Sequence, residues 1–205
     1  MKICHIFAGG ELGDIADFRT TPLRGMVICA DSGYRHAQEL RIKPDVIVGD
    51  FDSYGGELPK DCEIIRTVPE KDDTDTLMAL KIAIERGYEH IYLYGALGGA
   101  RFDHAFANIQ TMLYAREHGA ELELIGNEHV YLQGAGEREY PQTGSYFSVF
   151  ALTETVRIKE LSGVKYPLRD YEMKPSFPVG VSNEITDGAA FLAIESGLAL
   201  VIQTK

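Results

Sequence analysis

The chain has 205 residues, which is enough for one large domain or two small ones. Its composition, 45% hydrophobic and 25% charged, is ordinary for a soluble globular protein. The formal net charge of −11 argues against broad binding to nucleic acid or to an anionic membrane, and no apolar run approaches the roughly 20 residues of a membrane span.

The first half of the chain alternates apolar runs with helical patterns. Helices are expected through residue 40, through residue 86 and from near residue 101. Strands are expected at residues 3–8, 26–30, 46–48, 62–68, 91–94 and 122–125. This alternation predicts an α/β N-terminal three-layer domain with a mostly parallel sheet, spanning residues 1–127.

Three of these strands end in glycines, acids or both. Gly9 and Gly10 follow the first strand, where they either let backbone amides approach a ligand or simply make a tight turn. Asp31, Ser32 and Gly33 follow the second strand. Asp31 or Ser32 could cap the next helix, but α/β sheets also place ligands at the carboxyl ends of their strands.

The third strand is followed by Asp50 and Asp52. In an extended backbone these residues point to the same side, so two carboxylates would lie together. Two neighbouring anions repel and therefore need a cation or a shared proton, and Mg²⁺ is the cation that suits oxygen ligands. The alternative is a solvated acidic turn.

An acidic turn precedes the second expected helix. Asp72, Asp73 and Asp75 crowd this turn beside Lys71, and either Thr74 or Asp73 is a plausible N-cap. Lys71 could neutralise phosphate charge or pair locally with an aspartate.

The third expected helix begins after a glycine-rich stretch at residues 95–99. Arg101, His104 and Asn108 then share one helix face, with Asp103 beside them. This arrangement suits recognition of a polyphosphate, although a solvated polar face would look the same.

After residue 127 the chain becomes a series of short alternating strands with frequent turn residues, which predicts an all-β C-terminal sandwich or barrel domain at residues 128–205. Glu195, Ser196 and Gly197 are expected to form a hairpin. The polar tip at residues 182–184 is either a turn or a surface for a small polar ligand. Three widely spaced cysteines suit reduced thiols in a cytoplasmic protein.

In sequence order, six motifs resemble the thiamine pyrophosphokinase (thiamine diphosphokinase) family. They are AGG (8–10), ADSG (30–33), PDVIVGDFDS (44–53), EKDDTD (70–75), GALGGARFDHAFANI (95–109) and GVSNE (180–184). Each motif is weak alone, but together and in this order they are highly specific.

The resemblance implies an enzyme that moves the diphosphate of ATP onto the hydroxyl of thiamine and releases AMP, with Mg²⁺ required. It further implies a homodimer whose active sites lie between the catalytic domain of one subunit and the β domain of the other. The β domain would therefore bind thiamine and mediate dimerisation.

The candidate site combines these implications with the reasoning from the residues. The metal-binding acids would be Asp50, Asp52 and Asp75, and Arg101 and Asp103 would join them in catalysis. Ser182 and Asn183 would belong to the thiamine pocket. The expected ATP contacts are Asp31, Ser32, Gly33, Ser53, Lys71, Asp72, Thr74, His104 and Asn108.

Two departures from the family pattern are visible. Ala100 separates the glycine pair from Arg101, where the family usually has GGR. The chain also has no Trp, so any aromatic ring stacked on thiamine must come from Tyr or Phe.

Two other functions compete with this one. The DFDS segment resembles the signature of haloacid-dehalogenase-type phosphatases, with Asp50 as nucleophile and Asp52 as acid, but that signature normally follows the first strand. A non-catalytic nucleotide or thiamine sensor is the second alternative.

Overall fold

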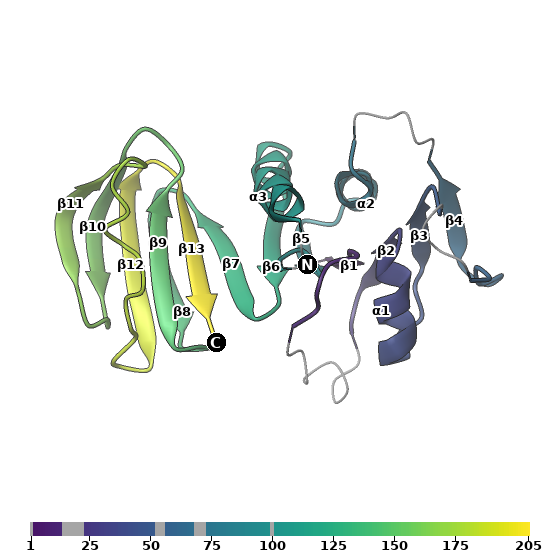
Figure 1. Ribbon diagram of the computed structural model, residues 1–205. Helices are drawn as coiled ribbons and strands as arrows, with labels where there is room; N and C mark the ends of the chain where they lie inside the picture. Colours follow the sequence, from purple (N-terminus) through teal and green to yellow (C-terminus); the bar gives the residue numbers. More distant parts are fainter. Residues whose placement is uncertain (1, 14–22, 52–55, 68–72, 99–100) are drawn as a thin grey trace. The chain divides into compact units, whose positions relative to one another are not determined.

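The structure is a computed structural model that describes residues 2–13, 23–51, 56–67, 73–98 and 101–205 (Figure 1). Its contacts divide the chain into two compact units, Met1–Asn127 and Glu128–Lys205. The first is an α/β unit and the second contains only strands among its regular elements.

The α/β unit is built on six parallel strands in the spatial order β4-β3-β2-β1-β5-β6. Their bounds are β1 Ile3–Phe7, β2 Met26–Ala30, β3 Val46–Gly49, β4 Glu63–Arg66, β5 His90–Tyr94 and β6 Glu121–Ile125. β2 and β3 are buried along their whole length, as expected of parallel strands covered on both faces. The predicted parallel sheet is therefore confirmed.

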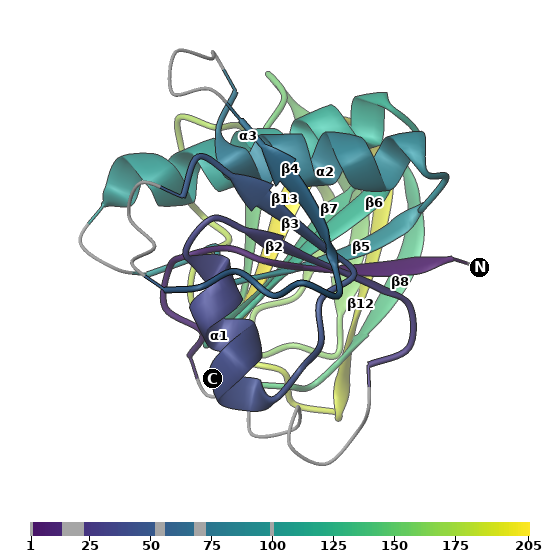
Figure 2. The same cartoon turned by 90° about the vertical axis from the view of Figure 1, so that its right-hand side faces the viewer.

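Three helices pack on this sheet: α1 Gly33–Leu40, α2 Asp75–Glu85 and α3 Phe102–Glu117. Figure 2 shows α1 on one side of the sheet and α2 and α3 on the other. α1 contributes Tyr34 and Ala37 to an apolar cluster with Phe7 and Ile47 of the sheet. Buried side chains of α2 include Ala79, Leu80, Ile82 and Ala83, which match the apolar helix face of the sequence.

The strand order contains one reversal of direction. From β1 the chain moves outward through β2 and β3 to β4, and it then returns to place β5 on the other side of β1. In open parallel sheets the crevice for a ligand lies at such a switch point, outside the carboxyl ends of the strands. The fold therefore directs attention to the ends of β1 and β5.

The β unit contains two groups of antiparallel strands. One has the order β7-β13-β9 and the other the order β11-β10-β12-β8. Side chains from both groups form one apolar core, in which Tyr140 and Phe147 are fully buried. The bounds are β7 Glu128–Gln133, β8 Gly136–Pro141, β9 Tyr146–Ala151, β10 Val156–Ser162, β11 Leu168–Met173, β12 Ala189–Ser196 and β13 Ala199–Thr204.

The hairpin expected at residues 195–197 is wrong. β12 and β13 follow each other closely in sequence, but β12 pairs with β10 and β8, whereas β13 pairs with β7 and β9. Two alternating strands joined by a short glycine turn look the same whether they pair or change sheets. Gly197, with φ +94°, provides the sharp change of direction.

Two further expectations concern the whole chain. None of the helices in the described ranges is long and apolar enough to cross a membrane. Cys4, Cys29 and Cys62 are all free thiols, and burial raises the pKa of the Cys4 thiol to about 12. A thiol with so high a pKa is a poor nucleophile at neutral pH.

Candidate active site

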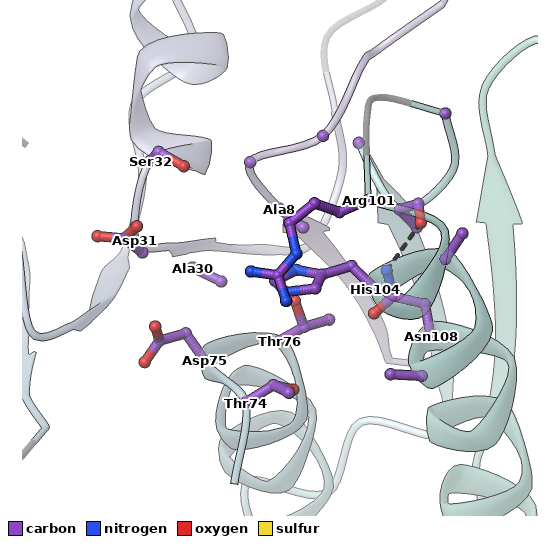
Figure 3. A pocket seen from close by; sticks show the side chains of 17 residues that line it. Ala8, Ala30, Asp31, Ser32, Thr74, Asp75, Thr76, Arg101, His104 and Asn108 are labelled. Atoms are coloured by element: carbon purple, nitrogen blue, oxygen red, sulfur yellow. Dashed lines mark hydrogen bonds between the residues drawn. The ribbon is translucent and has the colours of Figure 1, made fainter. Parts of the chain in front are cut away.

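A cavity of about 360 Å³ lies at the carboxyl ends of β1, β2 and β5, at the switch point of the sheet. Loops after these strands form one wall, and the first residues of α2 and α3 form the other (Figure 3). Predicted site residues that line it are Asp31, Ser32, Thr74, Asp75, Arg101, His104 and Asn108. The structure thus brings together residues that are up to 77 positions apart in the sequence, from Asp31 to Asn108.

The three helices that the structure describes in the α/β unit all begin at this cavity. Ser32 precedes α1, Thr74 precedes α2 and Arg101 precedes α3. Thr74 caps its helix by accepting a hydrogen bond from the Leu77 amide at 3.1 Å. Among the described residues, neither Ser32 nor Arg101 caps its helix with a side-chain hydrogen bond. Helix N-termini carry partial positive charge and free amides, so their convergence favours an anionic ligand.

Two carboxylate side chains, those of Asp31 and Asp75, also line the cavity. Asp31 follows β2 with φ +45°, and its amide donates to the Val48 carbonyl at 2.7 Å, which fixes the turn. Asp75 is the first residue of α2, and its Oδ1 accepts a hydrogen bond from Thr67 Oγ1 at 3.3 Å. In Figure 3 the Asp31 and Asp75 side chains lie on one side of the cavity, with Arg101 extending from the other.

The backbone at Asp50 differs from the expectation. Phe51 has φ +62°, a left-handed conformation, so the extended backbone of β3 does not continue through Phe51. The sequence argument assumed an extended backbone here, and that assumption does not hold at Phe51, so a shared side for Asp50 and Asp52 stays a prediction. Asp50 is partly buried at the end of β3 and is not among the residues that line the cavity, and Asp52 lies outside the described residues.

Basic side chains come from the start of α3. The guanidinium of Arg101 forms a bidentate ion pair with Asp103, at 3.2 Å from Nε and 2.5 Å from Nη2. These hydrogen bonds lower the pKa of the Asp103 carboxyl, although both side chains are largely exposed. Asp103 does not line the cavity, so the structure lets it orient Arg101 without facing a ligand itself.

Asn108 holds the glycine-rich loop after β5. Its side chain is 8% exposed, and Nδ2 donates to the Ala96 carbonyl at 2.7 Å (Figure 3). That hydrogen bond uses the amide group that the sequence assigned to a phosphate. Asn108 therefore shapes the cavity wall by fixing the loop.

The glycines of the site pack chain segments closely. A Cβ on Gly9 would collide with Ser32 Oγ, and one on Gly10 would collide with the Gly95 carbonyl oxygen. A Cβ on Gly33 would likewise collide with the Phe7 carbonyl, so Gly33 allows α1 to pack closely against β1. Gly33 is not among the residues that line the cavity. The Gly10 amide donates to the Gly95 carbonyl at 2.9 Å and is not available to a ligand.

Asp73, one of the acids in the turn before α2, forms an ion pair within the α/β unit and does not line the cavity. Its carboxylate forms a 2.6 Å ion pair with Lys81 on the next turns of α2, and this hydrogen bond raises the pKa of Lys81. Asp73 therefore braces the start of α2, while Asp75 faces the cavity. The remaining predicted residues of this half, Ser53, Lys71 and Asp72, lie outside the described residues, as does Ala100.

The donor set at the cavity suits a hard cation. Within the described residues, no group of three or more His, Cys, Asp or Glu side chains could hold a metal ion. Mg²⁺ is commonly held by one or two carboxylates together with substrate phosphates, so a complete protein cage is not required. Asp75 and Asp31 line the cavity and carry carboxylate oxygens of that kind.

In the β unit, the polar tip has a different organisation from the one expected. Asn183 is only 6% exposed, and its side chain bonds to the backbone of Tyr166: Nδ2 donates to the carbonyl at 2.9 Å, and Oδ1 accepts from the amide at 3.0 Å. Ser182 is exposed, with φ +55°. Asn183 thus holds a neighbouring loop, and Ser182 remains accessible.

Tyr166, whose backbone bonds to the Asn183 side chain, was not predicted from the sequence as a site residue. Tyr166 presents an aromatic ring that is 62% exposed, with Lys165 Nζ 5.7 Å from its centroid. Lys165 also forms an ion pair with Glu184 at 2.8 Å, so charged groups flank the ring. One signal was present in the sequence: Tyr166 stands among glycine and proline residues in a segment rich in turns, where an aromatic ring has little core to fill.

Two family models match the chain. The model described as "Thiamin pyrophosphokinase, catalytic domain" matches residues 23–124, and "Thiamin pyrophosphokinase, vitamin B1 binding domain" matches residues 137–199. The first match contains every cavity residue from Ala30 to Asn108, and the second contains Tyr166, Ser182 and Asn183.

Individual relatives extend over the full length. A thiamine pyrophosphokinase of Bacillus subtilis (strain 168) is 28% identical over 215 residues, covering 100% of this chain and 99% of the relative. The crystal structure of thiamine pyrophosphokinase from Bacillus subtilis superposes with a TM-score of 0.87 at 25% identity, covering 100% and 99% of the two chains. A thiamin pyrophosphokinase family protein from Enterococcus faecalis gives a TM-score of 0.83 at 28% identity with the same coverage.

Proposed function

This chain belongs to the thiamin pyrophosphokinase family, and we propose that it binds ATP in the cavity at the ends of β1, β2 and β5. The protein is a thiamine diphosphokinase, which transfers the diphosphate of ATP to the hydroxyl of thiamine and releases AMP. The observation that supports the location is the convergence of three helix N-termini, two carboxylates and Arg101 on one cavity.

The reaction needs positioning and charge neutralisation more than covalent help from the protein. The hydroxyl oxygen of thiamine attacks the β-phosphorus of ATP. The bond from that phosphorus to the bridging oxygen of the α-phosphate breaks, its electron pair leaves with AMP, and the hydroxyl proton is released. The partial positive charge of the helix N-termini and the guanidinium of Arg101 would stabilise the phosphate oxygens, which carry the charge throughout.

We propose Asp50, Asp52 and Asp75 as the ligands of Mg²⁺. Asp75 lines the cavity, and Asp50 lies at the end of the adjacent part of the sheet, since Gly49 packs against Asp31. When bound, the cation would neutralise charge on the transferred phosphates. Asp31 also lines the cavity and is a further candidate oxygen ligand.

The ATP contacts divide into two groups under this proposal. Ser32, Thr74, Arg101 and His104 line the cavity and would face the nucleotide, whereas Gly33, Asp103 and Asn108 would act by fixing its walls. For Ser53, Lys71 and Asp72 the proposal rests on the family motif alone.

We propose that thiamine stacks on Tyr166 beside Ser182. Thiamine carries a cationic thiazolium ring, and an exposed tyrosine face attracts such a ring through the cation–π interaction. Tyr166 is exposed, and two hydrogen bonds from Asn183 hold its backbone. This assignment gives the chain, which has no Trp, an aromatic partner for its substrate.

The finer architecture and the assembly are also proposals. We describe residues 1–127 as a three-layer α/β catalytic domain, because helices cover both faces of its sheet, and residues 128–205 as a sandwich, because two groups of strands share one core. A homodimer would cover large exposed apolar side chains in both units, which include Phe102, Phe106, Phe177 and Val181. The free thiols suit a cytoplasmic location.

Product identification tests the activity directly. The purified protein is incubated with ATP, Mg²⁺ and thiamine, and the products are separated by chromatography. Thiamine diphosphate and AMP are expected in equal amounts. A phosphatase would release inorganic phosphate without thiamine, and a sensor would release nothing, but neither alternative is favoured by the family match or by Asp50 following the third strand.

A further inference from the structure

His36 on α1 forms a hydrogen bond with a residue of the cavity wall but does not itself line the cavity. Its Nε2 lies 2.7 Å from the carbonyl oxygen of Gly10, a residue that lines the cavity. A carbonyl can only accept, so Nε2 carries the hydrogen and donates it. On the other side, the Gly10 amide donates to the Gly95 carbonyl. Both polar groups of Gly10 are thus held, one by α1 and the other by the end of β5.

The turn that His36 holds has no spare room. Neither Gly9 nor Gly10 could carry a Cβ without collision, because Ser32 and Gly95 pack directly against them. These four residues all line the cavity. A shift of the Gly10 carbonyl would therefore move the wall at which we place ATP.

The second ring nitrogen of His36 indicates that the hydrogen bond to Gly10 is the reason for a histidine at this position. Nδ1 is buried and has no hydrogen-bond partner among the described residues. By contrast, the buried His5 uses both nitrogens, with Tyr94 Oη at 3.0 Å and the Arg24 carbonyl at 3.3 Å. Burying an unpaired polar atom costs free energy that an apolar side chain would avoid. The bond to Gly10 is the interaction that offsets this cost.

We propose that His36 is a positioning residue for ATP, which fixes the wall formed by Gly9 and Gly10 without touching the nucleotide. The inference rests on the proposed ATP site, but it concerns a residue that does not line the cavity. It predicts a selective effect: loss of the His36 donor weakens the use of ATP and leaves the use of thiamine unchanged.

The test compares three variants by steady-state kinetics with Mg²⁺. His36→Leu removes the donor, and the KM for ATP is expected to rise about tenfold, the effect of one lost hydrogen bond, with the KM for thiamine within twofold of wild type. His36→Gln keeps an N–H donor at similar reach and should recover most of the ATP affinity. His118→Leu is the control, because His118 also bonds a backbone carbonyl, that of Tyr114 at 2.8 Å, but lies at the far end of α3.

Thermal unfolding of each variant separates positioning from general destabilisation. If His36→Leu does not fold, His36→Asn, whose shorter side chain cannot reach Gly10, takes its place with the same expected rise. An unchanged KM for ATP, equal rises for both substrates, or a Gln variant as impaired as the Leu variant would overturn the inference. Absence of thiamine diphosphate and AMP with the wild-type protein would instead refute the proposed function.

Discussion

At Thr74, one side chain caps a helix and also lines the cavity. The sequence offered these as separate interpretations of the acidic turn, yet a helix that begins at a ligand site needs both. Neighbouring residues are divided differently. Asp73 pairs with Lys81 and is not among the residues that line the cavity, whereas Asp75 lines it. Function at this turn is decided by the direction of single side chains.

Replacement of the proposed metal-binding acids should abolish transfer without unfolding the protein. Asp75→Asn and Asp50→Asn remove charge but keep side-chain size, so we expect activity to fall at least about a hundredfold. The measurement is AMP release with Mg²⁺ and ATP, with circular dichroism as the check on folding. Asp73→Asn is the matched control from the same turn and should keep activity within about threefold, because Asp73 pairs with Lys81. Wild-type turnover in both Asp50→Asn and Asp75→Asn would contradict the assignment.

His5 should make the stability of the fold depend on pH. Burial lowers the pKa of His5 below its ordinary value of 6.5, so the folded protein keeps the ring neutral. Between that lowered pKa and 6.5 the unfolded chain binds more protons, and the free energy of unfolding therefore decreases as pH falls through this window. Urea unfolding at pH 7.0 and 5.5 measures the decrease, and His5→Gln should reduce it. Equal decreases in the two proteins would show that other groups cause the effect.

At the scale of elements, the cavity depends on where strands end and helices begin. The strands that border the cavity, β1, β2 and β5, are followed by an alanine, an aspartate and a glycine, and each of the three described helices starts at the cavity. The β unit uses a different device, in which the side chain of Asn183 holds the loop that contains Tyr166. Both arrangements present groups to a ligand from backbone that is fixed elsewhere.

Substitutions in the Tyr166 loop should raise the KM for thiamine more than the KM for ATP. Tyr166→Ala removes the exposed ring, and we expect the KM for thiamine to rise about tenfold or more, while Tyr166→Phe keeps the ring and stays within about threefold. Asn183→Ala should raise the same KM and also lower the unfolding temperature, because it leaves the Tyr166 backbone groups without their partner. Ser182→Ala, at an exposed position, should raise the KM without loss of stability. Equal effects on both substrates would count against a thiamine site here.

At the scale of the molecule, the proposed function assigns different substrates to the two units. The cavity proposed for ATP belongs wholly to residues 1–127, and the proposed thiamine loop belongs to residues 128–205. The family resemblance implies that each active site joins units from two subunits of a homodimer. Such a site takes residues from both chains. A dimer of one subunit mutated in the α/β unit and one mutated in the β unit should therefore regain activity.

Mixed dimers test this assembly. Asp75→Asn and Tyr166→Ala proteins carry different affinity tags and are mixed under conditions that exchange subunits. Activity is assayed at a thiamine concentration well below the KM of Tyr166→Ala, at which each variant alone is inactive or weak. If sites form between subunits, half of the dimers are mixed and each holds one intact site, which restores about a quarter of wild-type activity. Co-purification of both tags verifies the exchange. If exchange occurs and activity does not return, the site is formed within a single chain.

The order and type of elements in the α/β unit could be read from the sequence. Buried parallel strands are short continuous apolar runs, and each such run here ends at a residue that breaks it, so local pattern was sufficient. The motifs likewise indicated the family. These features depend on neighbours in the chain, which the sequence displays directly.

Other features depended on contacts that no local pattern encodes. The left-handed φ of Phe51 turned the chain away from an extended path at Asp50, and β12 and β13 joined different sheets although only two residues separate them. The amide of Asn183 was taken by a backbone 17 residues away, and His36 reached Gly10 across 26 residues. Sequence determines which groups are present and how each segment prefers to fold, whereas the tertiary structure decides which of those groups meet, because proximity comes from the packing of the whole unit.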